Sequence, residues 1–171
     1  MTAEIVVFDL ETTGLSPLKG HRVIEIGAVR ITDDQPGEVF HSLIDAGRPL
    51  FKRTVRINGI TDAMLRGGPS PGEAFRDFRN FCGNATLVAH NAPFDKLFLQ
   101  YEYSRFGWGL RNPVICTLRM SRQRLPDLPN YRLETVAQHL LGEAALGNRK
   151  AHRALDDARL TAQIWLALEG R

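Results

Sequence analysis

The sequence lacks several features that would place it outside the class of soluble globular proteins. It has only two cysteines, Cys82 and Cys116, without the spacing of a metal site, so we expect reduced thiols rather than a disulfide framework. No apolar run is long enough to cross a bilayer, and the N-terminus shows no signal-peptide pattern. Internal repeats and low-complexity segments are also absent. The sequence therefore predicts a cytoplasmic protein without a membrane partner.

The net charge is also small, at +3 for 171 residues, and 43% of the residues are hydrophobic. These values are typical of one globular domain with a full core, so we predict a single domain over residues 1–171. Such a charge is weak evidence for a nucleic-acid partner. Arginines are nevertheless concentrated in one third of the chain: Arg105, Arg111, Arg119, Arg122, Arg124 and Arg132. Taken alone, this segment is explained most simply as a solvated basic face.

Short apolar runs predict strands, and apolar residues at helical spacing predict helices. The expected strands are Ile5–Phe8, Val23–Ile31, Glu38–Ile44, Thr86–Ala89 and Val114–Cys116. The expected helices are a short one capped by Thr61, then Ser70–Phe81, Pro93 to about Phe106, Leu133–Leu141 and Ala154–Leu168. Pro49–Gly68 is otherwise expected to be irregular, and Asp33–Gly37 to connect two antiparallel strands. This order predicts an α/β protein with a mixed five-stranded sheet flanked by helices.

The first strand carries two carboxylates, Asp9 and Glu11, at positions i and i+2. Side chains alternate faces along a strand, so both carboxylates point to the same side. Like charges placed in this way repel each other and lose solvation unless a cation lies between them, and oxygen ligands favour Mg²⁺ or Mn²⁺. From this stretch alone, two solvated acids on a strand that frays into a loop are an equally good explanation.

A third acid, Asp95, lies in the sequence HNAPFD (residues 90–95), which follows a strand and opens a helix. Asn91 is expected to cap this helix. Asp95 shares helical spacing with three apolar residues, so we expect it at the N-terminal end of an inward face. These residues are Phe98, Leu99 and Phe106. The helix dipole explains the position of an acid along the helix, but it does not explain an inward orientation.

Two adjacent acids, Asp156 and Asp157, open the last helix in the sequence HRALDDA (residues 152–158). The positions i+3, i+4, i+7 and i+11 from Asp157 are mostly apolar, whereas those from Asp156 are more polar and offer an ion pair with Arg159. We therefore expect Asp157 to face the core and Asp156 to face solvent. His152 is a candidate general base, although a lone histidine is more often structural or solvated.

Four inward carboxylates and one histidine are the groups that two-metal phosphodiester hydrolysis needs. The three sequences FDLETTG (residues 8–14), HNAPFD and HRALDDA resemble, in order and spacing, the three motifs of the DEDDh 3′–5′ exonucleases. Within that group the chain is most similar to the proofreading (epsilon) subunit of bacterial DNA polymerase III and its stand-alone relatives. The resemblance covers nearly the whole chain. It implies a ribonuclease H-like fold, His152 as the base, a catalytic role for Glu11, and two Mg²⁺ or Mn²⁺ ions held by Asp9, Glu11, Asp95 and Asp157.

The same resemblance implies a set of residues that contact the 3′-terminal nucleotide. They are Thr12, Gly14, Leu15, Ile57, Asn58, Asn91 and Phe94. Ordinary core packing explains Leu15, Ile57 and Phe94 as well, and turn or capping roles explain the two asparagines. Many family members have a histidine where Asn58 stands, and an aspartate where Cys116 stands, so any role of that aspartate is absent here.

We therefore predict a metal-dependent 3′–5′ exonuclease that releases nucleoside 5′-monophosphates from single-stranded or frayed 3′ ends of DNA, as in polymerase III proofreading. Its expected partners are single-stranded 3′ ends of DNA, or of RNA, and a DNA polymerase subunit. The arginine-rich segment would then follow the nucleic-acid backbone. An exoribonuclease that trims RNA 3′ ends is one alternative, because the motifs do not report contacts to the 2′ hydroxyl. Two others are a nuclease-like binding module of a polymerase assembly, and an endonuclease or strand-transfer enzyme on the same fold.

Overall fold

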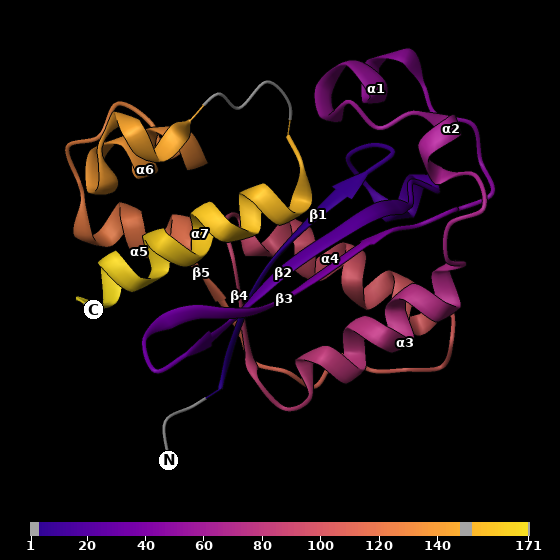
Figure 1. Cartoon of the computed structure of the whole chain (residues 1–171), viewed down its shortest axis with the longest axis horizontal. Helices are drawn as coiled ribbons and strands as arrows, with labels where there is room; N and C mark the ends of the chain where they lie inside the picture. The colour runs from indigo at the N-terminus through magenta and orange to yellow at the C-terminus, as the bar shows by residue number, and fades with distance from the viewer. Residues whose placement is uncertain (1–3, 148–151, 171) are drawn as a thin grey trace.

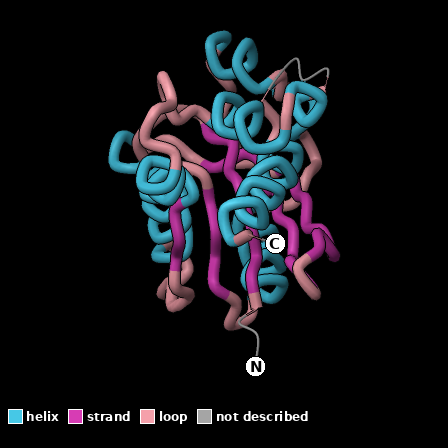
Figure 2. Tube along the Cα trace, turned by 90° about the vertical axis from the view of Figure 1, so that its left-hand side faces the viewer, coloured by secondary structure: helices cyan, strands magenta, loops and turns pink. Residues whose placement is uncertain are grey.

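A five-stranded mixed sheet forms the centre of the protein, with helices on both of its faces (Figures 1 and 2). The computed structural model describes residues 4–147 and 152–170. The strands are β1 (Ile5–Thr12), β2 (Val23–Thr32), β3 (Gln35–Leu43), β4 (Thr86–Ala89) and β5 (Val114–Cys116), and their order in the sheet is β3-β2-β1-β4-β5. β1, β2 and β3 are antiparallel neighbours, whereas β4 and β5 run parallel to β1. This arrangement confirms the predicted mixed sheet.

β1 separates the two layers of core. Val6, Phe8 and Leu10 are buried in the cluster that contains α3 and α4 residues, and Val7 belongs to the cluster beneath α7. Because side chains alternate, Asp9 and Glu11 share the face of Val7. The strand continues through both acids to Thr12, beyond the predicted end at Phe8. Its hydrogen-bonded partners on β2 hold both acids in regular strand geometry.

The connection between β2 and β3 is shorter than predicted. Asp33 and Asp34 have φ angles of 52° and 58°, and two successive residues with positive φ form a type I′ turn, whose twist matches that of the flanking strands. Thr32 already pairs with Gln35 across the hairpin. The residues from Gln35 to Gly37, which were expected in the connection, therefore belong to β3.

Helices α3 (Pro71–Cys82) and α4 (Ala92–Ser104) cover one face of the sheet. α3 forms where a helix was predicted, and Ser70 caps it through a capping box with Glu73. α4 ends at Ser104, two residues before the predicted end near Phe106, and Gly107 follows with a φ of 72°. Phe106 is 37% exposed and its ring lies 5.0 Å from that of Trp108. The prediction that Phe106 continues the inward face of α4 was therefore wrong.

Helix α7 (Ala154–Glu169) covers the other face. The predicted inward stripe is confirmed, because all of its members are buried: Asp157, Leu160, Thr161, Ile164 and Leu168. The start of α7 lies directly on β2. A Cβ atom on Gly27 would lie 2.1 Å from the backbone nitrogen of Leu155, so only glycine permits this approach.

The sequence did not predict two helices, α1 (Lys52–Asn58) and α5 (Thr117–Arg124). α1 contains three β-branched residues, which lower helix propensity, and α5 has too few apolar residues to show a periodic stripe. The remaining helices are α2 (Asp62–Leu65), α6 (Leu133–Leu141) and the 3-10 turns Pro17–Lys19 and Glu143–Leu146. Thr61 caps α2 as predicted. Among the described residues, no helix is long and apolar enough to cross a membrane.

Candidate functional site

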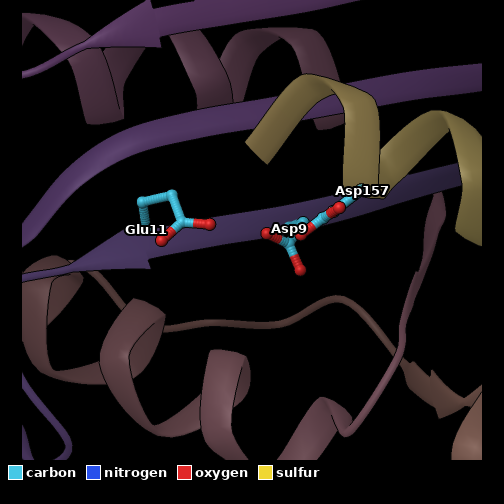
Figure 3. A group of neighbouring side chains, drawn as sticks. All are labelled: Asp9, Glu11 and Asp157. Carbon is cyan, nitrogen blue, oxygen red and sulfur yellow. The ribbon is translucent and has the colours of Figure 1, made fainter. Parts of the chain in front are cut away.

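Three acidic side chains meet where the C-terminal half of β1 passes the first turn of α7. Carboxylate oxygens of Asp9, Glu11 and Asp157 lie within 4.8 Å of one another. Figure 3 shows Asp157 reaching from α7 towards Asp9, with Glu11 further along the same strand. Asp156 instead faces solvent, with its carboxylate 3.7 Å from Arg159 and both side chains more than half exposed. The structure thus confirms that Asp157 is the inward acid of the pair.

Asp95 lies at the same end of β1, at the start of α4 on the other face of the sheet. Its side chain is buried and close enough to Glu11 for its negative charge to raise the pKa of Glu11. In the described part of the chain, the group of acids whose oxygens all lie within 4.8 Å of one another contains Asp9, Glu11 and Asp157 but not Asp95. Asp95 is therefore a neighbour of this cluster rather than one of its closest members.

Burial makes negative charge unfavourable in this cluster unless a cation compensates it. The pKa of Glu11 is raised to about 8: burial is the largest cause, the charges of Glu25 and Asp95 also raise it, and a hydrogen bond from Asn58 lowers it. Burial also raises the pKa of Asp95, although hydrogen bonds from the backbone N–H groups of Asp95 itself and of Leu10 lower it in part. Converging carboxylate oxygens, with raised pKa values at Glu11 and at the neighbouring Asp95, suit a hard divalent cation, which binds the deprotonated form.

His152 lies two residues before the start of α7 and borders the acidic cluster. Its Nδ1 lies 3.3 Å from an oxygen of Asp157, and its side chain is 53% exposed. The ring lines the same cleft as Asp9 and Asp157. Its place beside the acidic cluster keeps His152 a candidate general base.

An ion pair on a buried glutamate, which the sequence alone did not predict, anchors this end of α7. Glu25 on β2 is the cross-strand partner of Glu11 and is fully buried. Its carboxylate accepts hydrogen bonds from Arg153 Nη2 at 2.7 Å and from the backbone N–H of Ala154 at 3.0 Å. A glutamate in the otherwise apolar run Val23–Val29 was the available signal, since buried charges need partners.

An apolar pocket of about 650 Å³ adjoins Glu11. Most of the residues predicted to contact the terminal nucleotide line it: Thr12, Gly14, Leu15, Ile57, Asn58 and Phe94. Leu15 is 81% exposed and Ile57 is 48% exposed, so core packing does not explain them. Asn58 is buried and accepts the N–H of Ile60. Phe94 also packs on the core, with its ring 5.0 Å from Phe98.

Asn91 lies elsewhere. It occupies the N-cap position of α4, as predicted, but it has a φ of 64° and its side chain makes no capping bond. Asparagine tolerates the left-handed region better than most residues, which explains why it suits this strand-to-helix turn. It lines a second, polar cleft of about 900 Å³ with Asp9, His152 and Asp157.

The far wall of this second cleft comes from α5, from α6 and from the residues between them. Arg122 of α5 lines it, as do Tyr131 and Arg132 between the two helices. The other arginines of the arginine-rich segment do not line the cleft. Arg105 pairs with Glu102, and Arg124 pairs with Glu169. The segment therefore brings two arginines, rather than all six, to the candidate site.

Comparison with known proteins identifies the family. The sequence profile of the exonuclease family (RNase_T) matches residues 6–165, nearly the whole chain. The chain belongs to the exonuclease family. It is 40% identical over 169 residues to a PolC-type DNA polymerase III of Lacticaseibacillus paracasei, and 39% identical over 165 residues to a DNA polymerase III subunit epsilon-like protein of Rhodobacter capsulatus. These alignments cover 98% and 95% of this chain, but only 11% and 23% of the two relatives.

Solved exonuclease structures share the fold. Exonuclease X in complex with 5′-overhanging duplex DNA superposes with a TM-score of 0.77 at 25% identity, over 97% of this chain and 91% of that one. Escherichia coli exonuclease I in complex with a dA16 oligonucleotide gives a TM-score of 0.81 at 18% identity, over 99% of this chain and 41% of that one. The second likeness concerns the fold alone. Together they confirm the expected ribonuclease H-like architecture.

Proposed function

We propose that this exonuclease-family chain is a 3′–5′ exonuclease that releases nucleoside 5′-monophosphates from single-stranded or frayed 3′ ends of DNA. The observation that carries the proposal is the convergence of Asp9, Glu11 and Asp157, with oxygens within 4.8 Å of one another, beside His152. The complexes of exonuclease X and exonuclease I with DNA support a DNA substrate. The polymerase III relatives support a polymerase subunit as partner.

The donor set fits two divalent cations, Mg²⁺ or Mn²⁺. Asp9, Glu11 and Asp157 would hold them, with Asp95 as the fourth acid, because all four offer oxygen ligands at one end of β1. Such ions would supply activation of the attacking water and stabilisation of the leaving 3′ oxygen. Site assignments for all four acids are part of the proposal.

His152 would act as the general base. Since its Nδ1 faces Asp157, Nε2 is the ring atom in position to take the proton of the attacking water. The contact to Asp157 orients the ring, and the exposed position allows the proton to pass on to solvent. Glu11 would contribute to both metal binding and catalysis through its place beside the scissile bond.

The apolar pocket would hold the terminal nucleoside. Leu15 and Ile57 offer exposed apolar surface to its base. Thr12 and Gly14 belong to the segment that follows the acids of β1, and Phe94 closes the opposite side. Asn58 would act indirectly, through its hydrogen bond to Glu11. Asn91 would lie on the other side of the scissile bond.

A gel assay tests the proposal. The protein is incubated with 5′-labelled single-stranded DNA, and with RNA of the same sequence, in Mg²⁺, Mn²⁺ or EDTA. We expect a ladder of products shortened by one nucleotide that disappears in EDTA, with DNA degraded faster than RNA. A faster RNA ladder would favour the exoribonuclease alternative, and no ladder on either substrate from folded protein would favour a binding module. Cleavage of circular single-stranded DNA would indicate an endonuclease.

A further inference from the structure

Two hollows of different chemistry flank the acidic cluster. One is the apolar pocket beside Glu11, and the other is the polar cleft that contains Asp9, Asp157 and His152. Figure 1 shows the elements that form their outer walls, α1 and α6, on opposite sides of the molecule with the start of α7 between them. An exonuclease cuts the last bond of a strand, so one nucleoside lies on one side of the scissile phosphate and the remaining strand on the other.

The size and lining of the apolar pocket suit one nucleoside. Its volume of about 650 Å³ lies in the range of pockets for single small ligands. The polar cleft is larger, at about 900 Å³, and its far wall carries two guanidinium groups. Neither Arg122 nor Arg132 forms an ion pair with another described residue, in contrast to Arg124, which pairs with Glu169. Glu134 also lines this wall.

Hydrogen bonds fix the far wall in position. His90 Nε2 donates to the carbonyl of Tyr131 at 2.8 Å, and His90 Nδ1 lies 2.9 Å from the hydroxyl of Thr117. The Tyr131 hydroxyl donates to the carbonyl of Leu125. The guanidinium of Arg122 lies over the Tyr131 ring, 5.7 Å from its centroid. His90, at the end of β4, therefore acts as a support for this wall, since both of its ring nitrogens are engaged.

We infer that the polar cleft binds the part of the nucleic-acid strand on the 5′ side of the scissile bond, with Arg122 and Arg132 contacting its phosphates. Unpaired guanidinium groups on a supported wall suit phosphate oxygens. The strand then runs from this wall across the acidic cluster and ends with its 3′ nucleoside in the apolar pocket. This inference rests on the proposed function, and it adds the path of the strand and the residues that bind it.

The test compares two doubly substituted variants on DNA oligonucleotides of two and eight nucleotides. Arg122→Gln/Arg132→Gln removes the wall, and Arg111→Gln/Arg119→Gln removes the same charge from exposed positions in the same segment outside the cleft. KM and kcat are measured at salt concentrations from about 50 to about 200 mM, a range over which binding through phosphate contacts weakens strongly.

We expect the wall variant to raise the KM for the octamer about tenfold, with a smaller rise for the dinucleotide, which has little strand to place in the cleft. For this variant the slope of log KM against log salt concentration should fall by about 1.4, because each of the two lost phosphate contacts on a single strand contributes about 0.7 to the slope. The control variant should keep the wild-type KM and salt slope.

Two results would overturn the inference. They are an octamer KM of the wall variant equal to that of the wild type, and equal losses in the wall and control variants, which would indicate a general effect of charge. Failure of the proposed function is a separate result, since the wild-type protein would then not shorten either oligonucleotide.

Discussion

Substitution of Arg153 by methionine would test how the start of α7 is held on the sheet. Burial by itself raises the pKa of Glu25, but hydrogen bonds from Arg153, Ala154 and His41 hold it below its ordinary value. Arg153 supplies more than one of these bonds, through Nη2 at 2.7 Å and Nε at 3.0 Å. In Arg153→Met the fully buried carboxylate would keep only the Ala154 N–H and the His41 ring, which lies 2.7 Å away.

The expected loss of stability is large. Removal of one partner of a buried ion pair costs about 3–5 kcal/mol, and the two remaining hydrogen bonds place the expected value near the lower end, at ~3 kcal/mol. For a protein of 171 residues, a loss of that size lowers Tm by roughly 6–12 °C. Turnover should also fall, because Arg153 lies between His152 and the turn that presents Asp157.

Urea unfolding at pH 7, followed by far-ultraviolet circular dichroism, measures the free energy of unfolding. Arg159→Met is the matched control on the same helix, and it should change this free energy by less than ~0.5 kcal/mol, because its ion pair with Asp156 is solvent-exposed. Glu25→Met/Arg153→Met removes both charges, including the buried carboxylate, and should recover much of the loss.

The reasoning would be refuted if Arg153→Met unfolds at the wild-type urea concentration. It would also be refuted if the double substitution is at least as unstable as the single one, since the uncompensated charge would then not be the cause.

The remaining predictions concern the acidic cluster. Asp157→Asn should lower kcat at least ~100-fold, equivalent to several kcal/mol of lost transition-state stabilisation, whereas Asp156→Asn should leave kcat within about twofold; a ladder assay measures both. His152→Gln should lower kcat by about 10²–10⁴-fold while calorimetry still detects Mn²⁺ binding. Because the pKa of Glu11 is about 8 against an ordinary 4.5, the metal-free fold should lose stability from this group as pH rises between those values, and Mn²⁺ affinity should rise with pH up to about 8. Gly27→Ala should destabilise the fold by about 1–3 kcal/mol or more, since its Cβ would meet the backbone of α7.

Each of these predictions has a result that contradicts it. An active Asp157→Asn together with an inactive Asp156→Asn would reverse the assignment of the two acids. Loss of Mn²⁺ binding in His152→Gln would make His152 a metal ligand. Mn²⁺ binding at pH 7 without proton release would contradict the raised pKa of Glu11, and a wild-type free energy of unfolding for Gly27→Ala would contradict the close approach of β2 and α7.

Local patterns in the sequence were enough to identify most elements and the orientation of the key acids. Alternation along β1 placed Asp9 and Glu11 on one face, and helical spacing distinguished Asp157 from Asp156, because both periodicities are properties of the backbone itself. The order of strands and helices was likewise enough to indicate a mixed sheet covered by helices. The three motifs led to the exonuclease family before any distance was known, and the family comparison confirmed it.

Only the tertiary structure showed what depends on contacts between distant segments. The pair between Glu25 and Arg153 joins β2 to α7, and no local pattern couples those positions. α1 and α5 have weak helical signals of their own, and packing against the rest of the fold determines them. The packing of helices and strands against one another also determines three further features. These are the close approach at Gly27, the two hollows on either side of the acids, and the position of Arg122 and Arg132, alone among the six arginines, in the polar cleft. Periodicity determines which way a side chain faces, whereas packing determines what it meets there.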